Sequence, residues 1–400
     1  MIVPNKKSLG NTLLHRDTFM EEMTLQDICK IYDCPHTTAK DEGVGIPLVR
    51  TPNVGKGRLV LTNVHRVNSD VYKERTLRAI PEEDDIIIAR EAPVGNAAII
   101  QKKQKVCLGQ RVVLLKPNKA LVDPNFLVYY LLSNEVQHHL KIHANGAVVA
   151  HLNVADIRNL SVCLPSLCEQ KKIGKSLKII DDKIELNRRI NDNLEHQAQA
   201  LFKSWFVDFE PFKGEKFMES QLGMIPKGWK VGTLSDLLDI RYGKDHKKLN
   251  DGNVPVYGSG GIMRLADGIL YNGESVLIPR KGTLNNVLYV NWPFWAVDTM
   301  FYSIEKVPNV AKYCHLLLSK LDLASMNSGS AVPSMTTDIL NKIQVIVAKQ
   351  DVFSSFNKCI SSLYLKAKIN LDENKRLSET RDLLLPKLMS GRLIINDLHS

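Results

Sequence analysis

Two long stretches of the chain repeat hydrophobic residues every three to four positions, with charged and amide residues between them. This spacing places the apolar side chains on one face of an α-helix. About 35 helical residues span about 50 Å, which is far longer than an ordinary globular helix. We therefore expect the two helices to pair with each other. The apolar positions are Ile173, Leu177, Ile180, Ile184, Ile190, Leu194 and Leu201 in the first stretch, and Phe353, Phe356, Ile360, Leu363, Ile369, Leu377 and Leu384 in the second.

The segments that precede the two helices resemble each other, and the matches occur in the same order in both halves. One match is explained by chance, whereas an ordered series indicates an internal duplication. The second copy is shorter than the first, mostly in the stretch after its opening helix. The matched segments are 24–28 with 233–237, 45–58 with 253–264, 84–96 with 274–286 (Arg90 on Arg280), and 145–165 with 328–348 (Gly146 on Gly329 and Val162 on Val345).

The duplication defines the expected domain organisation. Short β-branched runs flanked by Gly, Pro and Asn predict strands within each copy, and apolar-periodic runs predict helices. The expected fold is of the mixed α/β (α+β) class, with two duplicated globular domains separated by the two long helices. The expected segments are an N-terminal arm (1–22), the first globular domain (23–163), the central long helix (164–209), a connector containing Pro and Gly (210–229), the second globular domain (230–348) and the C-terminal long helix (349–395).

Local signals place the elements within each domain. A capped helix opens the first domain at Thr24, and a helix is expected at 126–140, after Asp123-Pro124. A further helix is expected near 310–321. The strand candidates are residues 46–49, 59–61, 86–88, 97–100 and 112–115 in the first domain, and 254–257, 275–278 and 287–290 in the second.

The charge balance indicates the class of partner. Lys and Arg number 53 against 43 acidic residues, which gives a formal net charge of +10. A polyanion such as nucleic acid, or an acidic surface, is the natural partner of such a chain. The net charge fits a basic soluble protein without such a partner equally well. Other features are needed to distinguish the two.

The cysteines indicate a reducing compartment. Seven are present, an odd number, and none forms a Cys-x-x-Cys pair, which argues for free thiols. Cys29, Cys34 and His36 lack a fourth ligand at suitable spacing, so no metal site is expected. The N-terminus has no signal-peptide pattern and no run is long enough to span a membrane. We therefore expect a cytoplasmic protein.

Three phrases at the helix ends give the chain a family resemblance. They are LPSLCEQKKIG at the start of the first long helix, ALFKSWFVDFEPF at its end, and LLLPKLMSGRL at the end of the second. With two diverged domains that each precede a long helix, the chain resembles the specificity subunit of a type I restriction-modification system. The resemblance covers residues 23–395, and departs from the family pattern at AKQDVFSSFN, where the second helix opens without the Leu-Pro pair.

The resemblance implies a function. In that family each globular part is a target recognition domain that reads one half of a split sequence in double-stranded DNA. The long helices pair as an antiparallel coiled coil that fixes the distance between the domains. They also hold two modification (methyltransferase) subunits and, through these, the restriction subunits. No cofactor is implied for the specificity subunit itself.

Basic residues in Gly-rich loops are the candidate DNA contacts. Arg pairs with guanine and Asn with adenine, while Lys and other Arg side chains bind phosphate. A solvated surface charge explains each residue as well, and Arg90 and Arg280 are also explained by an arginine that holds a turn in both domains. His138, His139 and His143 contact phosphate or lie on an exposed helix face. The candidates are Arg50, Lys56, Arg58, Arg90, Asn96, Arg241, Lys244, Lys247, Arg264, Arg280 and Lys281.

The aromatic residues at the end of the first long helix allow two interpretations. They pack inside the protein, or they form an apolar anchor for a partner subunit. The residues are Phe202, Trp205, Phe206 and Phe209.

No catalytic motif is recognisable. The chain lacks the Asp/Asn-Pro-Pro-aromatic loop of amino-methyltransferases and a phosphate-binding Gly-x-x-x-x-Gly-Lys-Ser/Thr loop. The acidic cluster 82–85 suggests either a nuclease site or a solvated turn, but no Glu-x-Lys element follows it. We expect a non-catalytic subunit. The alternatives are a self-contained DNA nuclease or methyltransferase with duplicated binding domains, and a coiled-coil adaptor that does not bind DNA.

Overall fold

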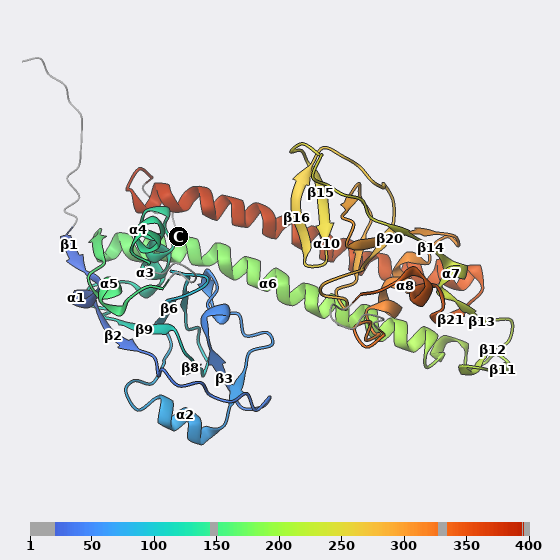
Figure 1. Cartoon of the computed structure of the whole chain (residues 1–400), viewed down its shortest axis with the longest axis horizontal. Coiled ribbons are helices and arrows are strands. Elements are labelled where there is room, and N and C mark those ends of the chain that lie inside the picture. The colour runs from blue at the N-terminus through green and yellow to red at the C-terminus, as the bar shows by residue number, and fades with distance from the viewer. Residues whose placement is uncertain (1–20, 145–150, 327–333, 394, 396–400) are drawn as a thin grey trace, which may run out of the picture. The chain divides into compact units, whose positions relative to one another are not determined.

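The structure is a computed structural model that describes residues 21–144, 151–326, 334–393 and 395 (Figure 1). Most of the expected N-terminal arm and the glycine pair Gly146 and Gly329 lie outside the described residues. The chain divides into two compact units, which are unit 1 (residues 1–185 and 373–400) and unit 2 (residues 186–372). Each unit contains one globular domain and one half of each long helix.

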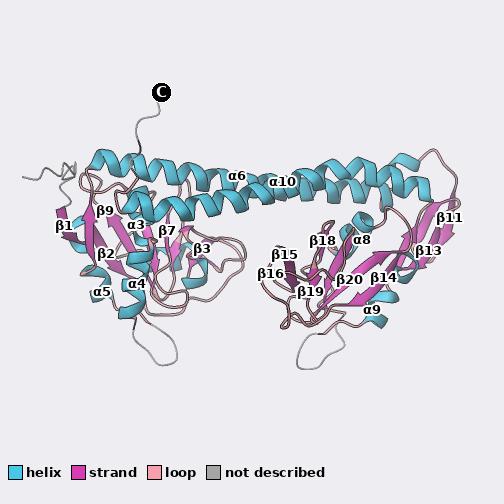
Figure 2. Ribbon diagram, turned by 90° about the horizontal axis from the view of Figure 1, so that it is seen from above, coloured by secondary structure: helices cyan, strands magenta, loops and turns pink. Residues whose placement is uncertain are grey.

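The two long helices are α6 (Leu167–Phe206) and α10 (Gln350–Met389), each of 40 residues. In unit 1 the first half of α6 lies beside the second half of α10, where Arg381 donates to Asp181 at 2.8 Å. In unit 2 the second half of α6 lies beside the first half of α10, where Asn370 donates to Asn191 at 2.8 Å. The helices are therefore antiparallel, as the family resemblance predicts (Figure 2).

Asparagines interrupt the apolar stripe of both helices. Asn187 and Asn370 are only 0% and 1% exposed, whereas Ile369, which the sequence pattern assigned to the stripe, is 46% exposed. The assignment of Ile369 is wrong, because the residues along the seam, which is the face where the two helices pack on each other, recur at seven-residue intervals. Phe356, Leu363, Asn370, Leu377 and Leu384 occupy one such row of α10, and Ile173, Ile180, Asn187, Leu194 and Leu201 occupy one of α6.

Unit 1 is built on a five-stranded sheet with the order β2-β9-β6-β7-β4. A smaller sheet has the order β5-β3-β8, and β1 pairs with β10. The strands are β1 (Glu21–Thr24), β2 (Cys29–Asp33), β3 (Ile46–Val49), β4 (Gly57–Arg58), β5 (Arg66–Val67), β6 (Ile86–Ala89), β7 (Ala97–Ile99), β8 (Cys107–Leu108), β9 (Val112–Pro117) and β10 (Ser161–Leu164). The helices are α1 (Leu25–Ile28), the 3-10 turn η1 (Thr51–Asn53), α2 (Ser69–Arg75), α3 (Pro124–Leu131), α4 (Asn134–His143) and α5 (Val154–Arg158).

The core of unit 1 lies between the large sheet, α3 and the two long helices. Phe126 of α3, Leu177 of α6 and Leu388 of α10 are buried in one cluster with strand residues. Gly174 allows α6 to approach α3 closely, since a Cβ there would lie 2.6 Å from the Phe126 amide nitrogen. The single helix expected at 126–140 is two helices, because the chain turns at Leu132 and Ser133 and the Gln137 side chain binds the Leu131 carbonyl.

Unit 2 repeats this arrangement with a four-stranded sheet of order β14-β20-β17-β18. A smaller sheet has the order β16-β15-β19, and β13 pairs with β21. The expected connector holds a β-hairpin, β11 with β12. The strands are β11 (Phe217–Ser220), β12 (Gly223–Pro226), β13 (Lys230–Thr233), β14 (Leu238–Tyr242), β15 (Val254–Gly258), β16 (Gly261–Ala266), β17 (Ser275–Pro279), β18 (Leu288–Val290), β19 (Trp295–Ala296), β20 (Met300–Glu305) and β21 (Gln344–Val347). The helices are η2 (Glu210–Phe212), α7 (Leu234–Leu237), α8 (Ala311–Leu318) and α9 (Thr337–Asn341).

Equivalent hydrogen bonds confirm the duplication. Thr24 and Thr233 each open a one-turn helix with a capping box, in which the aspartate three residues later binds back to the threonine. The Leu152 amide donates to the Arg90 carbonyl at 2.9 Å, and the Met335 amide donates to the Arg280 carbonyl at 2.9 Å. The matched segments therefore fold alike.

Most expected strands are present within a residue of the predicted bounds. The strand expected at 112–115 is longer and extends to Pro117. The strand expected at 59–61 is absent, because only an isolated bridge at Leu59 forms and the strand is β4, just before it. The sequence pattern missed several strands, among them β16 and the central strand β20. It also missed β2 and β14, which each follow a one-turn helix directly and carry polar residues. In the part of the chain that the structure describes, no helix is long and apolar enough to cross a membrane.

Candidate nucleic-acid interface

The strand registers bring the same two positions together in each unit. In unit 2, β14 and β17 flank β20, with Tyr242 opposite Phe301 and Pro279 opposite Met300. Arg280 therefore emerges beside Tyr242. In unit 1, β2 and β6 flank β9, with Asp33 opposite Val113 and Ala89 opposite Val112. Arg90 thus emerges beside Asp33. We call the edge of each sheet where these strands reach their C-terminal ends its carboxyl edge, and the carboxyl edges of the two units are structurally equivalent.

The carboxyl edge of unit 2 combines positive charge with an exposed aromatic ring. The Arg280 guanidinium lies 5.3 Å from the centroid of the Tyr242 ring, and Tyr242 is 51% exposed. Arg280 also donates to the Asp298 carbonyl at 3.3 Å. Neighbouring Lys281 is exposed, and Arg241 is exposed but pairs with Asp239 at 2.8 Å. The predicted residues Arg241, Arg280 and Lys281 thus lie at the ends of the two parallel strands β14 and β17.

The loop that follows β14 presents Lys244 and Lys247 to solvent. The Trp295 indole donates to the Lys244 carbonyl at 2.9 Å, which fixes the start of this loop. Arg264 donates to the carbonyls of His246 and Leu249, both at 2.8 Å. Arg264 therefore stabilises the loop through its backbone carbonyls, while the side chains of Lys244 and Lys247 remain accessible.

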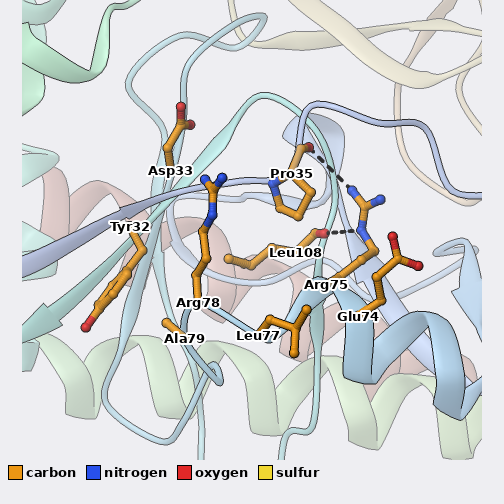
Figure 3. A pocket seen from close by; sticks show the side chains of 9 residues that line it. All are labelled: Tyr32, Asp33, Pro35, Glu74, Arg75, Leu77, Arg78, Ala79 and Leu108. Carbon is orange, nitrogen blue, oxygen red and sulfur yellow. Dashed lines mark hydrogen bonds between the residues drawn. The ribbon is translucent and has the colours of Figure 1, made fainter.

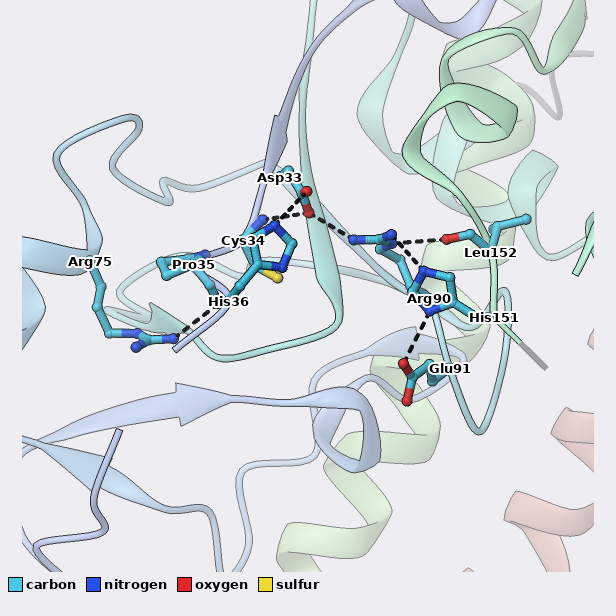
Figure 4. Close-up of polar contacts among 9 residues, drawn as sticks. All are labelled: Asp33, Cys34, Pro35, His36, Arg75, Arg90, Glu91, His151 and Leu152. Carbon is cyan, nitrogen blue, oxygen red and sulfur yellow. Dashed lines mark hydrogen bonds and ion pairs between the residues drawn. The ribbon is translucent and has the colours of Figure 1, made fainter. Parts of the chain in front are cut away.

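The carboxyl edge of unit 1 has a different chemistry (Figure 4). Arg90 is 8% exposed and donates to Asp33 at 3.0 Å and to the Leu152 carbonyl at 2.9 Å. It also lies 2.7 Å from Nε2 of His151, which accepts, so Nδ1 of His151 donates to Glu91 at 3.0 Å. Each of the three guanidinium nitrogens of Arg90 therefore has a partner within the domain. This arrangement fits the alternative interpretation of Arg90 as an arginine that holds a turn.

A hollow of about 240 Å³ opens beside this edge, between the end of β2 and the segment after α2 (Figure 3). Arg78 extends between Tyr32 and Pro35 toward Asp33, and no hydrogen bond or ion pair holds it among the described residues. Arg75, in contrast, is buried and donates to the Leu108 carbonyl at 2.9 Å. Sequence reasoning missed Arg78. No pattern in the sequence marks it, because the exposure of its neighbours Leu77 and Ile80 is visible only in the structure.

The remaining candidates of unit 1 mostly serve the fold. Arg58 forms an ion pair with Asp182 of α6, and Asn96 donates to the Val54 carbonyl at 2.9 Å. Arg50 is partly buried and packs on Gly109, where a Cβ would lie 2.6 Å from the Arg50 Cγ. Lys56 alone of this group is exposed. Three histidines, His138, His139 and His143, lie exposed on α4.

The aromatic residues at the end of α6 lie in the core of unit 2. Phe202, Phe206 and Phe209 are 4%, 2% and 8% exposed, and Trp205 is partly buried. Phe206 packs edge-on against Phe356 of α10 with ring centroids 4.8 Å apart. The burial of the three phenylalanines fits the interpretation that these residues pack inside the protein, and Trp205 is the most exposed of the four.

The other groups considered for chemistry are also engaged. Lys116 pairs with Glu82 at 2.7 Å and with Asp85 at 2.8 Å, and Lys119 pairs with Asp84 at 2.6 Å, so three of the four acidic side chains of this turn form ion pairs. Cys34 is fully buried, and burial raises the pKa of its thiol. All seven cysteines are free thiols. Within the described ranges, no group of three or more His, Cys, Asp and Glu residues has the geometry of a metal site.

The chain contains two copies of one mixed α/β domain, and the equivalent strand ends carry different polar residues. This arrangement defines a class of protein with two related recognition domains in one chain. The family model for the type I restriction modification DNA specificity domain matches residues 19–196 and 226–352. These two segments are the two repeats. The chain therefore belongs to this family and is a specificity subunit, as its resemblance predicts.

Individual relatives agree with this assignment. The type I restriction enzyme MjaIX specificity subunit of Methanocaldococcus jannaschii is 28% identical, over 83% of this chain and 82% of the relative. The HindI specificity subunit of Haemophilus influenzae is 26% identical, over 71% of this chain and 80% of the relative. The crystal structure of an S subunit from M. genitalium covers 94% of this chain and 97% of its own, with a TM-score of 0.55 and 18% identity, which shows the shared fold.

Proposed function

We propose that this specificity subunit reads a bipartite sequence in double-stranded DNA, with each globular domain reading one half. The observation that carries the proposal is the pair of equivalent carboxyl edges with different side chains. Arg280 and Tyr242 occupy the edge in unit 2, whereas Arg90 and Asp33 occupy it in unit 1. One scaffold with two different edges suits two different half-sequences, which identical subunits of a homodimer do not.

The second domain offers a direct means of contact. A partly exposed arginine beside an aromatic ring suits a base edge or a sugar, and exposed lysines suit the phosphates on either side. We assign these roles to Arg280 with Tyr242, and to Lys244, Lys247 and Lys281.

The first domain differs, because the arginine at the equivalent strand end is paired inside the protein. Each guanidinium nitrogen of Arg90 already has a partner, so we assign contact to Arg78, whose guanidinium is unpaired within the described residues, and to Lys56. Asp33 and Glu91 give this edge an acidic character that the edge of unit 2 lacks, and both already accept from side chains of the domain, Asp33 from Arg90 and Glu91 from His151 and Arg111. The two domains therefore recognise bases through different chemistry.

The long helices are proposed to set the spacing of the half-sites. Each helix of 40 residues spans about 60 Å. Half-sites read from one face of B-DNA lie about 34 Å apart, or at multiples of that distance. A helix of this length suits that separation.

Methylation and cleavage are proposed to come from partners. The chain lacks the recognisable motifs of a methyltransferase or a nucleotide-driven translocase, and three of the four side chains in its acidic cluster are held in ion pairs with lysines. We propose that two modification subunits bind the helices, one near each domain, and that restriction subunits join through them. The chain needs no cofactor of its own in this scheme.

Methylation mapping in the source organism tests the proposal. We expect a two-part methylated adenine motif in the wild-type genome that disappears when this gene is deleted. The purified chain should bind DNA weakly and with strong salt dependence when alone, and specifically with its modification subunit. A genome whose methylation does not change on deletion, or a purified chain that methylates or cleaves DNA by itself, contradicts the proposal.

A further inference from the structure

A cavity of about 610 Å³ lies in unit 2 between β18, α8 and the two long helices. Tyr289 of β18 and Trp292 just after it form one wall, Lys312 and His315 of α8 form another, and Tyr364 of α10 lies across from them. At the corresponding place in unit 1, Gly57 of β4 lies against Asp181 of α6 and Tyr129 of α3, since a Cβ at Gly57 would be 3.2 Å from the Asp181 carboxylate. The difference between the two units indicates what the cavity accepts.

β18 and β7 are equivalent strands. Each pairs antiparallel with the strand that ends at Arg280 or Arg90. In unit 1, β7 has β4 as a second neighbour, whereas β18 is the edge of its sheet in the described part of unit 2. The segment 50–65, which joins β3 to β5, carries β4. The equivalent strands β15 and β16 are joined by residues 259–260 alone.

The segment in unit 1 shows how the edge is completed. Gly57 and Arg58 pair in parallel with Ala98 and Ile99 of β7. The flanking residues Val54 and Leu59 are buried, and the Arg58 side chain reaches Asp182 of α6. In unit 1, an extended segment with buried apolar flanks therefore pairs with the outer side of β7, and its basic side chain forms an ion pair with a long helix.

The charges around the cavity of unit 2 favour a basic occupant. Lys312 is compensated by Glu274 at 2.9 Å, and Lys368 by Asp372 at 2.6 Å. Asp192 and Glu195 of α6 also line the cavity, and neither has an ion pair among the described residues.

We propose that β18 is a docking edge for an extended, basic segment of a partner protein. The segment adds as a fifth strand parallel to β18, as β4 does to β7, and directs a Lys or Arg side chain to Asp192 and Glu195. Main-chain hydrogen bonds supply the affinity and the acidic pair supplies the specificity. The inference rests on the proposed function, because the partner is the modification subunit of the same complex.

Hydrogen exchange tests this edge in the full-length chain. The chain is compared alone and in complex with its modification subunit, and peptides covering residues 286–292 and 96–100 are followed by mass spectrometry. We expect amide exchange of 286–292 to slow by at least about tenfold in the complex. The peptide 96–100 should not change, since β7 already has both neighbours.

Charge reversal tests the chemistry of the partner segment. The double variant Asp192→Lys/Glu195→Lys should lose the protection of 286–292 and weaken assembly by at least about tenfold. The control Glu215→Lys/Glu219→Lys changes the charge equally at exposed positions, and should assemble normally. Protection that survives the first double variant overturns the basic partner.

DNA binding by the same complex separates the two ideas. Unchanged exchange at 286–292 in a complex that binds its bipartite target overturns the docking edge and leaves the proposed function standing. A wild-type complex that binds no specific DNA overturns both.

Discussion

Equivalent arginines occupy the same strand end in both units but differ in what surrounds their charge. Arg90 is 8% exposed and paired with Asp33, whereas Arg280 is partly exposed and lies over Tyr242. An arginine whose donors are satisfied inside the protein has little left for DNA. Of these two equivalent arginines, Arg280 is the accessible one, which makes it the residue to test.

The variant Arg280→Ala should weaken binding of the assembled complex to its target by about 10- to 100-fold, because a bidentate arginine-base contact contributes about 1–3 kcal/mol. Selectivity should relax only at one position in the half read by the second domain. Equilibrium binding to the target and to single-base variants of it measures both effects.

Lys306→Ala is the matched control for that variant. Lys306 follows β20, which runs antiparallel to β17, so it lies at the opposite edge of the same sheet. It should leave both affinity and selectivity unchanged. Equal losses from both variants would mean that Arg280 acts through general charge rather than through a base.

His315 in the wall of the unit 2 cavity makes this unit sensitive to acid. Its Nδ1 lies 2.7 Å from the Tyr364 hydroxyl, and burial lowers the pKa of the imidazole to about 4. An unfolded histidine takes up a proton near pH 6.5, whereas the folded one stays neutral down to about pH 4. Between these values the unfolded state binds more protons, so unit 2 should lose up to about 3 kcal/mol of stability as the pH falls.

Tryptophan fluorescence can follow this loss, because all four tryptophans lie in unit 2. Denaturant unfolding of the wild type and of His315→Gln is compared from pH 7 to pH 4. The variant should show the smaller loss, since glutamine does not titrate. Parallel curves for the two proteins would exclude His315 as the cause.

At the scale of the elements, the helix pair is held by buried polar contacts as well as by its apolar seam. Asp181 is 4% exposed, accepts from Arg381 at 2.8 Å and accepts from the Tyr129 hydroxyl at 2.7 Å. The asparagines Asn187, Asn191 and Asn370 occupy seam positions that would otherwise be apolar. Polar seam residues of this kind fix the register of paired helices at some cost in stability.

The variant Arg381→Met should destabilise unit 1 by about 3–5 kcal/mol, because it leaves the Asp181 carboxylate buried without its partner. Native-state hydrogen exchange of residues 167–185 measures the effect. The control Arg376→Met changes an exposed residue of the same helix and should have little effect. Adding Asp181→Asn to Arg381→Met should restore most of the stability; no recovery would contradict the charge argument.

At the scale of the whole molecule, the duplication predicts modular specificity. Replacing residues 23–163 with the corresponding piece of a relative should change only one half of the methylated motif. Methylation mapping after the exchange measures this directly. A change in both halves would contradict independent reading by the two domains.

The structure adds a condition to that exchange. Leu388 of α10 is buried in the same core as the first domain, and Gly174 of α6 allows α3 to pack closely. A relative that differs at these helix positions should give an unstable chimera. Donor pieces should therefore be chosen to fit the existing helices.

Several features could be predicted from the sequence because they depend on local spacing. The two long helices, the one-turn helices at Thr24 and Thr233, and the match of Arg90 with Arg280 are visible as patterns along the chain. The helix seam was predicted less well. Apolar periodicity selected Ile369, whereas the structure buries Asn370, because a seam position is set by the facing helix as well as by hydrophobicity.

The sequence by itself determined the duplication, the helix pair and the family, because repeats and hydrophobic periodicity depend only on the order of residues along the chain. Tertiary structure alone decided which cations are free. It pairs Arg90 with Asp33, Arg58 with Asp182 and Arg381 with Asp181, although each pair is far apart in the chain. Whether a charge binds DNA or holds the fold depends on what the folded chain places within about 4 Å of it, and that distance is not written in the order of residues.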